Sequence, residues 1–113
     1  MELEVREIGG VTLAVMSGRL DAVTAEAFGE RLAALVERGG SRLLLDLEAL
    51  AYLSSMGLRK LVLAAKRLGE TGGRLAVCGC RSPVREVLQL TGFDHVAPSY
   101  TTRDEALASF REP

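Results

Sequence analysis

Residues 43–47 read Leu-Leu-Leu-Asp-Leu, an almost uninterrupted apolar run near the middle of the chain. A strand that is apolar on both faces belongs in the centre of a sheet that helices cover. Apolar residues at helical spacing precede this run and follow it, so we expect an amphipathic helix on each side. The apolar positions are Phe28, Leu32, Leu35 and Val36 in the first helix, and Leu58, Leu61, Val62, Ala65 and Leu68 in the second.

The N-terminal segment predicts a β-hairpin. Glu2–Ile8 alternates loosely between charged and apolar residues, which is typical of a half-exposed edge strand. Gly9-Gly10 is a two-residue hairpin signal, and Val11–Met16 supplies the second strand. Residues 17–21, Ser-Gly-Arg-Leu-Asp, are expected to break that strand before the first helix, which Gly39-Gly40 would end.

The second half of the chain continues the alternation. We expect a short connection over residues 52–57, a helix that Gly72-Gly73 ends, and a buried strand over Leu75–Cys78. Ser82-Pro83 predicts the start of a third helix, with Ser82 at the N-cap and Pro83 in the first turn. The inner face of this helix would consist of Val84, Val87 and Leu88, with Gly92 closing it.

The last segment predicts a short strand at His95–Ala97 and a final helix that Thr101 or Thr102 caps. After the hairpin, alternating strands and helices favour a parallel sheet with right-handed crossovers. We therefore expect residues 1–113 to form one α/β domain, in which an N-terminal β-hairpin is followed by alternating strands and helices. Its sheet would be mixed but mainly parallel, with about four helices. The final helix would carry Ala106, Leu107 and Phe110.

Composition and charge argue against several classes of protein. Of the 113 residues, 48% are hydrophobic, which is enough for a core without a metal or a disulfide. Because 14 Lys and Arg stand against 15 Asp and Glu and no basic stripe occurs, we expect no direct nucleic-acid binding. No apolar run approaches the roughly 20 residues of a membrane span, and the acidic N-terminus does not resemble a signal peptide. We therefore expect no membrane insertion and a cytoplasmic location.

The sequence lacks the motifs of an enzyme or of a cofactor site. It has no P-loop, no G-x-G-x-x-G and no metal-ligand spacing, so we expect neither a cofactor nor a metal. His95 is the one histidine, and without a G-x-S-x-G elbow it is expected to be a surface residue rather than a catalytic base. Cys78 and Cys80 would share one face of a strand, and we expect both to be reduced, small hydrophobic residues. Asp21 and Asp46 could meet as a carboxylate pair, or Asp21 could cap the first helix.

Residues 53–58, Leu-Ser-Ser-Met-Gly-Leu, carry the candidate functional site. They follow a buried strand and begin a helix, at the carboxyl edge of the sheet where α/β folds place functional groups. Ser54 or Ser55 could simply be the N-cap of that helix. Alternatively, a phosphate on a serine here would meet the free N–H groups and the positive end of the helix dipole. It would add about −1.5 to −2 charges without melting the helix.

Five stretches of the chain together carry a family resemblance. They are residues 17–22, Ser-Gly-Arg-Leu-Asp-Ala; 44–47, Leu-Leu-Asp-Leu; 52–59, Tyr-Leu-Ser-Ser-Met-Gly-Leu-Arg; 73–79, Gly-Arg-Leu-Ala-Val-Cys-Gly; and 84–94, Val-Arg-Glu-Val-Leu-Gln-Leu-Thr-Gly-Phe-Asp. Their order and spacing resemble a STAS domain of the anti-sigma factor antagonist type. The resemblance covers nearly the whole chain, from the first hairpin to the last helix.

The resemblance implies a binding protein rather than an enzyme. In this family, the antagonist binds an anti-sigma factor that is also a serine protein kinase, and the sigma factor is thereby freed. The kinase phosphorylates the antagonist and ends the interaction, and a serine phosphatase resets it. The family site reads Asp-Ser-Ser/Thr-Gly-Leu, with the first hydroxyl residue as acceptor. Aligned on Gly57, the acceptor is Ser55, while Ser54 stands at the position of the acid and Met56 at that of the second hydroxyl residue. Whether Ser54 is also modified stays open.

The expected docking surface surrounds Ser55. Asp21 matches a family acid near the acceptor, and the chain is expected to be a monomer or a weak dimer. A second function stays open, that of a STAS subunit in a stressosome-like scaffold or in a lipid or anion transport complex without a phosphoswitch. A small hydrolase using Ser55 is disfavoured because no general base is evident. The partner-binding residues are expected to be Asp21, Thr24, Ser54, Ser55, Met56, Gly57, Arg59 and Lys60.

Overall fold

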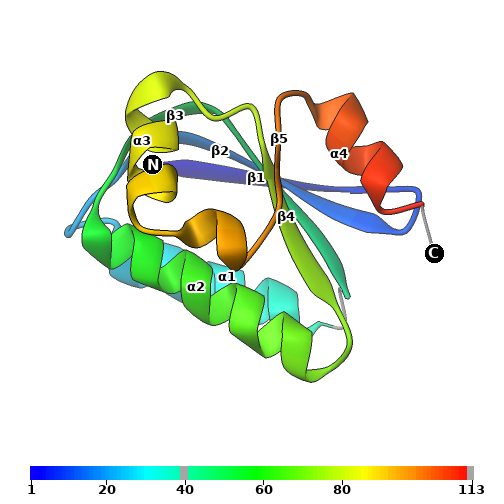
Figure 1. Cartoon of the computed structure of the whole chain (residues 1–113). Coiled ribbons are helices and arrows are strands. Elements are labelled where there is room, and N and C mark those ends of the chain that lie inside the picture. The colour runs from blue at the N-terminus through cyan, green and yellow to red at the C-terminus, as the bar shows by residue number, and fades with distance from the viewer. Residues whose placement is uncertain (39–40, 112–113) are drawn as a thin grey trace.

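The computed structural model describes residues 1–38 and 41–111, and over these residues it contains five strands and four α-helices (Figure 1). The α/β class and the N-terminal hairpin that the sequence predicts are confirmed. The predicted helix end at Gly39-Gly40 lies outside the described residues. In chain order the elements are β1 (Glu2–Ile8), β2 (Val11–Leu20), α1 (Ala25–Glu37), β3 (Arg42–Leu53), α2 (Ser55–Glu70), β4 (Arg74–Cys78), α3 (Ser82–Leu90), a 3₁₀ turn η1 (Phe93–His95), β5 (Ser99–Tyr100) and α4 (Arg103–Ser109).

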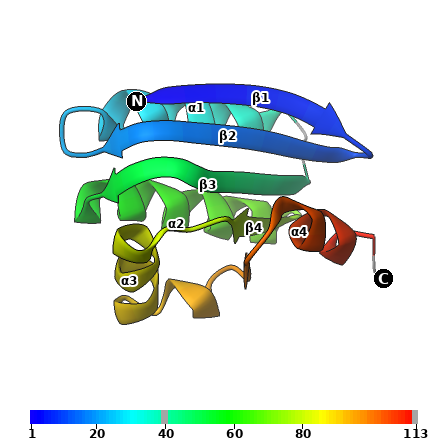
Figure 2. The same cartoon turned by 90° about the horizontal axis from the view of Figure 1, so that it is seen from above.

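One sheet in the order β1-β2-β3-β4-β5 forms the centre of the fold (Figure 2). β1 pairs antiparallel with β2, and every other pair of neighbours is parallel. The apolar run at residues 43–47 lies in β3, the middle strand, where Leu44 pairs with Leu13 on one side and with Ala76 on the other. The prediction of a central, doubly covered strand is therefore confirmed.

Helices cover both faces of this sheet, but unequally. α1 and α2 lie side by side on one face (Figures 1 and 2), and together with α3 they pack on a large core that includes Leu43, Leu45 and Leu47. On the other face, Phe110 at the end of α4 belongs to a smaller apolar cluster that includes Leu44. Alternate residues of β3 thus serve two separate cores, as the period of a strand requires.

Two strands are longer than the sequence predicts. β2 continues to Leu20 and β3 continues to Leu53. Leu20 pairs with Leu53, and two register shifts in the ladder between these strands absorb the irregular backbone. The predicted break is wrong for residues 17–20, which continue β2, and the chain leaves the strand only at Asp21. The predicted connection at residues 52–57 is also wrong, because only Ser54 separates β3 from α2.

The C-terminal region differs from the prediction at two points. Instead of a strand at His95–Ala97, the chain turns at Gly92, with φ of 75°, and forms η1, which buries Phe93. The last strand is β5, further along the chain. Ser82 is the first residue of α3 rather than its N-cap, because the backbone of Arg81 is the last extended position before the helix.

The two cysteines are buried and free, but they do not share a face. Gly79 has a φ of 72° and ends β4, so Cys78 belongs to the smaller cluster and Cys80 to the larger core. Burial raises the pKa of the Cys78 thiol to about 12. Further along the chain, Thr102 caps α4 through a reciprocal capping box with Glu105, one of the two caps that the sequence allows.

Candidate functional site

The carboxyl ends of β2 and β3 bring two predicted site segments together. The backbone N–H of Ser54 donates a 2.9 Å hydrogen bond to the carbonyl oxygen of Leu20. Asp21, the next residue, therefore lies beside the beginning of α2. This is the carboxyl edge of a parallel strand pair, the place where the sequence predicts the functional site.

The two neighbouring serines have different environments. Ser54 is the N-cap of α2, with an extended backbone (φ −85°, ψ 167°), and its side-chain oxygen accepts the N–H of Gly57 at 3.1 Å. Ser55 is the first helical residue and is exposed, and its hydroxyl forms no hydrogen bond with the rest of the described chain. The sequence allows either serine as the N-cap of α2, and in the structure the N-cap is Ser54.

Gly57 holds the start of α2 against the end of β2. The residue is buried, and a Cβ at this position would lie 2.6 Å from Cγ and 3.1 Å from the carbonyl oxygen of Leu20. Real Cβ atoms do not approach other atoms this closely. Because Gly57 has no side chain, the first turn of α2 can sit directly on β2, and this contact sets the position of Ser55.

Asp21 and Thr24 organise the turn between β2 and α1. The Asp21 carboxylate accepts the N–H groups of Val23 at 3.0 Å and of Thr24 at 3.1 Å. The Thr24 hydroxyl donates to the carbonyl oxygen of Arg19 at 2.9 Å and accepts the Asp21 N–H at 3.0 Å. The N–H of Thr24 is the main cause that lowers the pKa of Asp21, so this carboxylate is ionised at neutral pH. The N-cap of α1 is Thr24, so the predicted capping of the first helix by Asp21 is not confirmed. The Asp21 carboxylate instead stabilises the turn that precedes the helix.

Asp46 takes no part in this edge. It is buried in β3 beside Cys78, and its carboxylate forms an ion pair of 2.8 Å with Arg103 of α4. Leu53 follows Asp46 by seven residues in β3 and pairs with Leu20. Asp21 lies beyond this pair, at the far end of the strand from Asp46. The considered Asp21–Asp46 carboxylate pair is therefore not formed.

Exposed apolar residues lie in the segments that meet at this edge: Val23 in the turn after β2, Tyr52 near the end of β3 and Met56 directly after Ser55 in α2. The exposed fractions are 88% for Val23, 40% for Tyr52 and 50% for Met56. The Arg19 guanidinium stacks 4.3 Å from the centre of the Tyr52 ring. We call Val23, Tyr52, Ser55 and Met56 the Ser55 surface. Val23 and Tyr52 are not among the predicted site residues, because sequence alone does not separate an exposed apolar side chain from a core one.

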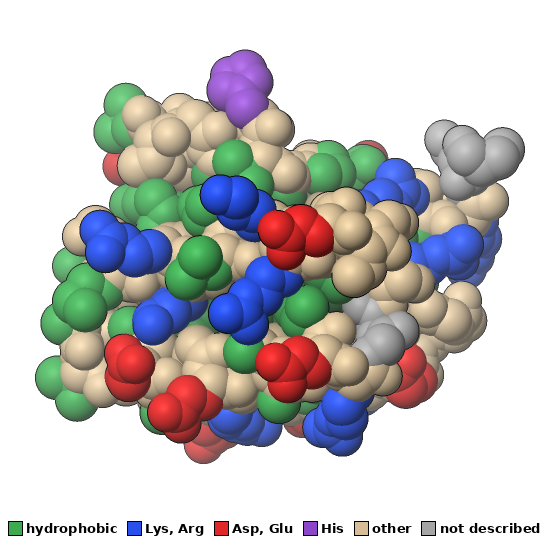
Figure 3. All heavy atoms as spheres, turned by 90° about the horizontal axis from the view of Figure 1, so that it is seen from below, with side chains coloured by type: hydrophobic (Ala, Val, Ile, Leu, Met, Phe, Trp, Pro, Cys, Tyr) green, Lys and Arg blue, Asp and Glu red, His purple; other side chains and the backbone are tan. Residues whose placement is uncertain are grey.

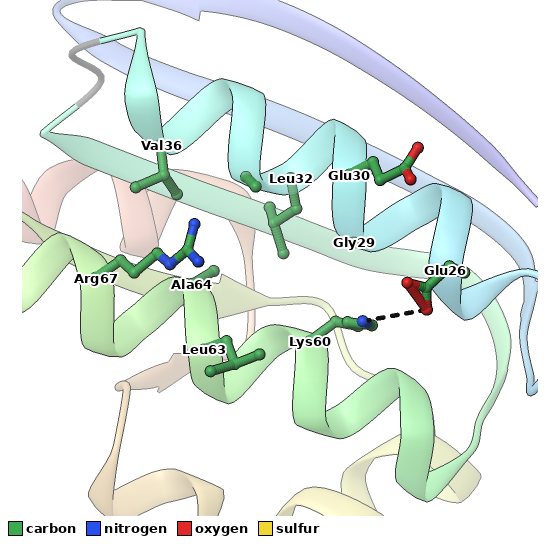
Figure 4. A pocket seen from close by; sticks show the side chains of 10 residues that line it. Glu26, Gly29, Glu30, Leu32, Val36, Lys60, Leu63, Ala64 and Arg67 are labelled. Carbon is green, nitrogen blue, oxygen red and sulfur yellow. Dashed lines mark hydrogen bonds and ion pairs between the residues drawn. The ribbon is translucent and has the colours of Figure 1, made fainter.

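The two basic residues predicted for the site differ in their surroundings. Arg59 is exposed on the first turns of α2. Lys60 is half-buried and turns towards α1, where its ammonium pairs with Glu26 at 3.5 Å (Figure 4). Lys60 therefore contributes to the contact between the two helices as well as to the surface.

In residues 1–38 and 41–111, no group of three His, Cys, Asp or Glu side chains could hold a metal ion. Over the same residues, no helix is long and apolar enough to cross a membrane.

Comparison with known proteins gives consistent similarities. Residues 2–106 match the sequence profile of the STAS domain. BtrV of Bordetella bronchiseptica, whose name assigns it to the anti-sigma factor antagonists, is 38% identical over 98% of this chain and 96% of its own length. The anti-sigma-F factor antagonist RsfB of Mycobacterium tuberculosis is 28% identical over 95% of this chain and 87% of its own. The crystal structure of an anti-sigma factor antagonist from Mycobacterium paratuberculosis is 33% identical, covers 98% of this chain and 94% of its own, and superposes with a TM-score of 0.91.

Proposed function

The chain belongs to the STAS domain family, and from this premise we propose that it is an anti-sigma factor antagonist switched by phosphorylation of Ser55. It binds an anti-sigma factor that is also a serine protein kinase, phosphate on Ser55 ends the complex, and a serine phosphatase restores the free form. One observation carries the proposal: Ser54 caps α2, so the exposed hydroxyl of Ser55 is free to accept a phosphate. The names of relatives that match nearly the full length support the role.

The Ser55 surface is suited to binding a protein. Tyrosine and methionine are enriched in the buried centres of interfaces. Tyr52 precedes Ser55 by three residues, and Met56 follows it directly. Both side chains are half exposed in the free protein, so a partner that covers them removes apolar area from water. Unphosphorylated Ser55 adds no charge to this contact.

A phosphate on Ser55 is compatible with the fold and unfavourable for the complex. At the first position of α2 it meets the N–H groups of the first turn and the positive end of the helix dipole, so the helix survives. In a covered interface, its charge of about −1.5 to −2 carries a desolvation cost. The ionised carboxylate of Asp21, next to the start of α2, adds repulsion. Each 1.4 kcal/mol of this cost weakens binding about tenfold.

The test is affinity capture from a lysate of the native organism, followed by mass spectrometry. Baits are the wild type, Ser55→Ala and Ser55→Asp, with Ser54→Asp as the matched control for charge at the neighbouring position. Wild type and Ser55→Ala should capture a serine kinase of the anti-sigma type, and Ser55→Asp should not. After incubation with the purified kinase and ATP, phosphate should appear on Ser55 and be absent from Ser55→Ala.

Two results would contradict the proposal. One is equal capture of the kinase by Ser55→Ala and Ser55→Asp, which would separate Ser55 from binding. The other is capture of transporter or scaffold subunits by all four baits without any kinase, which would leave the fold assignment intact and replace the function.

A further inference from the structure

A groove with a volume of about 190 Å³ runs between α1 and α2 on the solvent side of the helix pair (Figure 4). Its lining is mainly apolar, with Leu32 and Val36 from α1 and Leu63 and Ala64 from α2. Leu63 is a large hydrophobic residue with 44% of its surface exposed. A leucine exposed in a concave, mainly apolar setting offers apolar area that a partner could remove from water.

Side chains close one end of the groove, near the start of the two helices. Gly29 has no side chain, and the stem of Lys60 crosses it so closely that a Cβ on Gly29 would lie 2.7 Å from the Lys60 Cδ atom. The Lys60 ammonium then pairs with Glu26 and closes this end, while Arg67 lies beside Val36 at the other (Figure 4). The seven residues from Lys60 to Arg67 correspond to about 10 Å along α2.

One row of residues on α2 leads from the Ser55 surface to the groove. Met56, Lys60, Leu63 and Arg67 are spaced i, i+4, i+7 and i+11, which places them in one row on the helix. The apolar members of this row, Met56 and Leu63, are 50% and 44% exposed. A partner that covers Ser55 and passes over the Lys60–Glu26 pair therefore reaches the groove along the same row of α2.

The two rims of the groove carry opposite charges. Glu26 and Glu30 lie on α1, and Lys60 and Arg67 lie on α2. Figure 3 shows this face, with Lys and Arg side chains gathered beside Asp and Glu side chains and hydrophobic side chains exposed between them. Within the part of the chain that the structure describes, neither Glu30 nor Arg67 takes part in an ion pair.

We propose that this groove receives one amphipathic helix of the anti-sigma factor, an inference that rests on the proposed function. The helix lays an apolar stripe on Ala33, Val36 and Leu63, the apolar residues of the lining that are not fully buried. Acidic residues on one flank of the stripe face Arg67, and basic residues on the other flank face Glu30. Apolar residues at i and i+4 are about 6 Å apart along a helix, so two of them fit into the groove. Docking in the groove is thus separate from the chemistry at Ser55.

The test measures binding of the purified anti-sigma factor kinase captured above, by calorimetric titration against unphosphorylated variants. Leu63→Asp should weaken binding about tenfold or more, because it places a charge in the apolar groove. Arg67→Glu should weaken it about three- to tenfold through lost charge complementarity. Leu90→Asp is the matched control, since Leu90 is 88% exposed on α3, and it should bind within about twofold of the wild type.

A kinase assay supplies a readout that a folding defect would not reproduce. Because Ser55 is intact in Leu63→Asp and Arg67→Glu, the kinase should phosphorylate both with an unchanged kcat and a KM raised by the same factor as Kd. A circular dichroism melt of each variant confirms that the comparison is between folded proteins.

Wild-type affinity and KM in both Leu63→Asp and Arg67→Glu, with loss of binding in Ser55→Asp, would overturn the groove inference and leave the proposed function standing. Reduced binding in both groove variants with no effect of Ser55→Asp would overturn the phosphoswitch instead. Self-association of the wild type in sedimentation velocity, abolished by Leu63→Asp while kinase binding stays unchanged, would assign the groove to a second copy of the chain and also overturn the inference.

Discussion

The side chain of Leu20 fills the space that a side chain on Gly57 would need, since a Cβ on Gly57 would lie 2.6 Å from the Leu20 Cγ atom. This contact joins the last residue of β2 to the first turn of α2. Together with the hydrogen bond from the Ser54 N–H to the Leu20 carbonyl oxygen, this contact holds the start of α2 against the end of β2. The position of Ser55 therefore depends on the packing of a residue 35 positions earlier in the chain.

The Gly57–Leu20 contact predicts that Gly57→Ala destabilises the protein by about 1–3 kcal/mol, the usual cost of overpacking a well-filled site. Gly69→Ala is the matched control, because a Cβ on Gly69, also in α2, would meet nothing within 4 Å. That substitution should stabilise by about 0.5–1 kcal/mol through helix propensity. Urea denaturation measures both. Equal stability of the two variants would mean that β2 and α2 adjust to the added methyl group.

The two serines should differ in their effect on stability. Ser54→Ala removes the cap of α2 and should cost about 1 kcal/mol of unfolding free energy. Ser55→Ala removes an exposed hydroxyl and should change stability by less than about 0.5 kcal/mol. Thermal denaturation of the two variants beside the wild type makes the comparison. A larger loss in Ser55→Ala would show that Ser55 holds the helix, and would weaken its proposed role as acceptor.

The ion pair between Asp46 and Arg103 ties α4 to the sheet. Arg103→Ala leaves the Asp46 carboxylate, whose side chain is 5% exposed, with the Glu48 N–H as its remaining partner among the described residues. Because the Arg103 side chain is 37% exposed, we expect the free energy of unfolding to fall by about 1–3 kcal/mol. This loss is smaller than the one expected for breaking a fully buried ion pair. A double-mutant cycle with Asp46→Asn should show coupling of at least about 1 kcal/mol. Additive effects would indicate that the pair adds no net stability.

Asp21 gives the fold a defined response to acid. Its pKa is lowered from the ordinary value of 3.8, first by the N–H of Thr24, so the folded state holds this proton less tightly than the unfolded state. The stabilisation is therefore present above pH 3.8 and is lost as the pH falls through the lower, folded pKa. The stability difference between the wild type and Asp21→Ala should be constant from pH 7 to 5 and shrink below pH 4. A difference that is unchanged at pH 3 would contradict this account.

The fold could be predicted from local signals, and the site only in part. The run at residues 43–47 and the glycine pairs mark the central strand and the turns because period and turn chemistry are local properties. The full lengths of β2 and β3 depend on pairing between the two strands, which extends both of them past the ends that the sequence predicts. The contact of Asp46 with Arg103 spans 57 residues and leaves no periodic trace in the sequence. Which serine caps α2 depends on a single backbone conformation at Ser54.

Burial of Cys78 predicts that its thiol is unreactive in the native protein. With a pKa raised to about 12 by desolvation, about one thiol in 10⁴ is ionised at pH 8, and only the thiolate attacks alkylating reagents. Burial also raises the pKa of Cys80. Iodoacetamide labelling followed by mass spectrometry should therefore modify both residues only as fast as the protein opens, with rates that rise in urea in step with unfolding. Ser82→Cys, which places a thiol at an exposed position next to Arg81, is the control and should react within minutes. If Cys78 in the folded protein were labelled as fast as this control, the packing of β4 against α4 would have to open far more often than a closed apolar cluster allows.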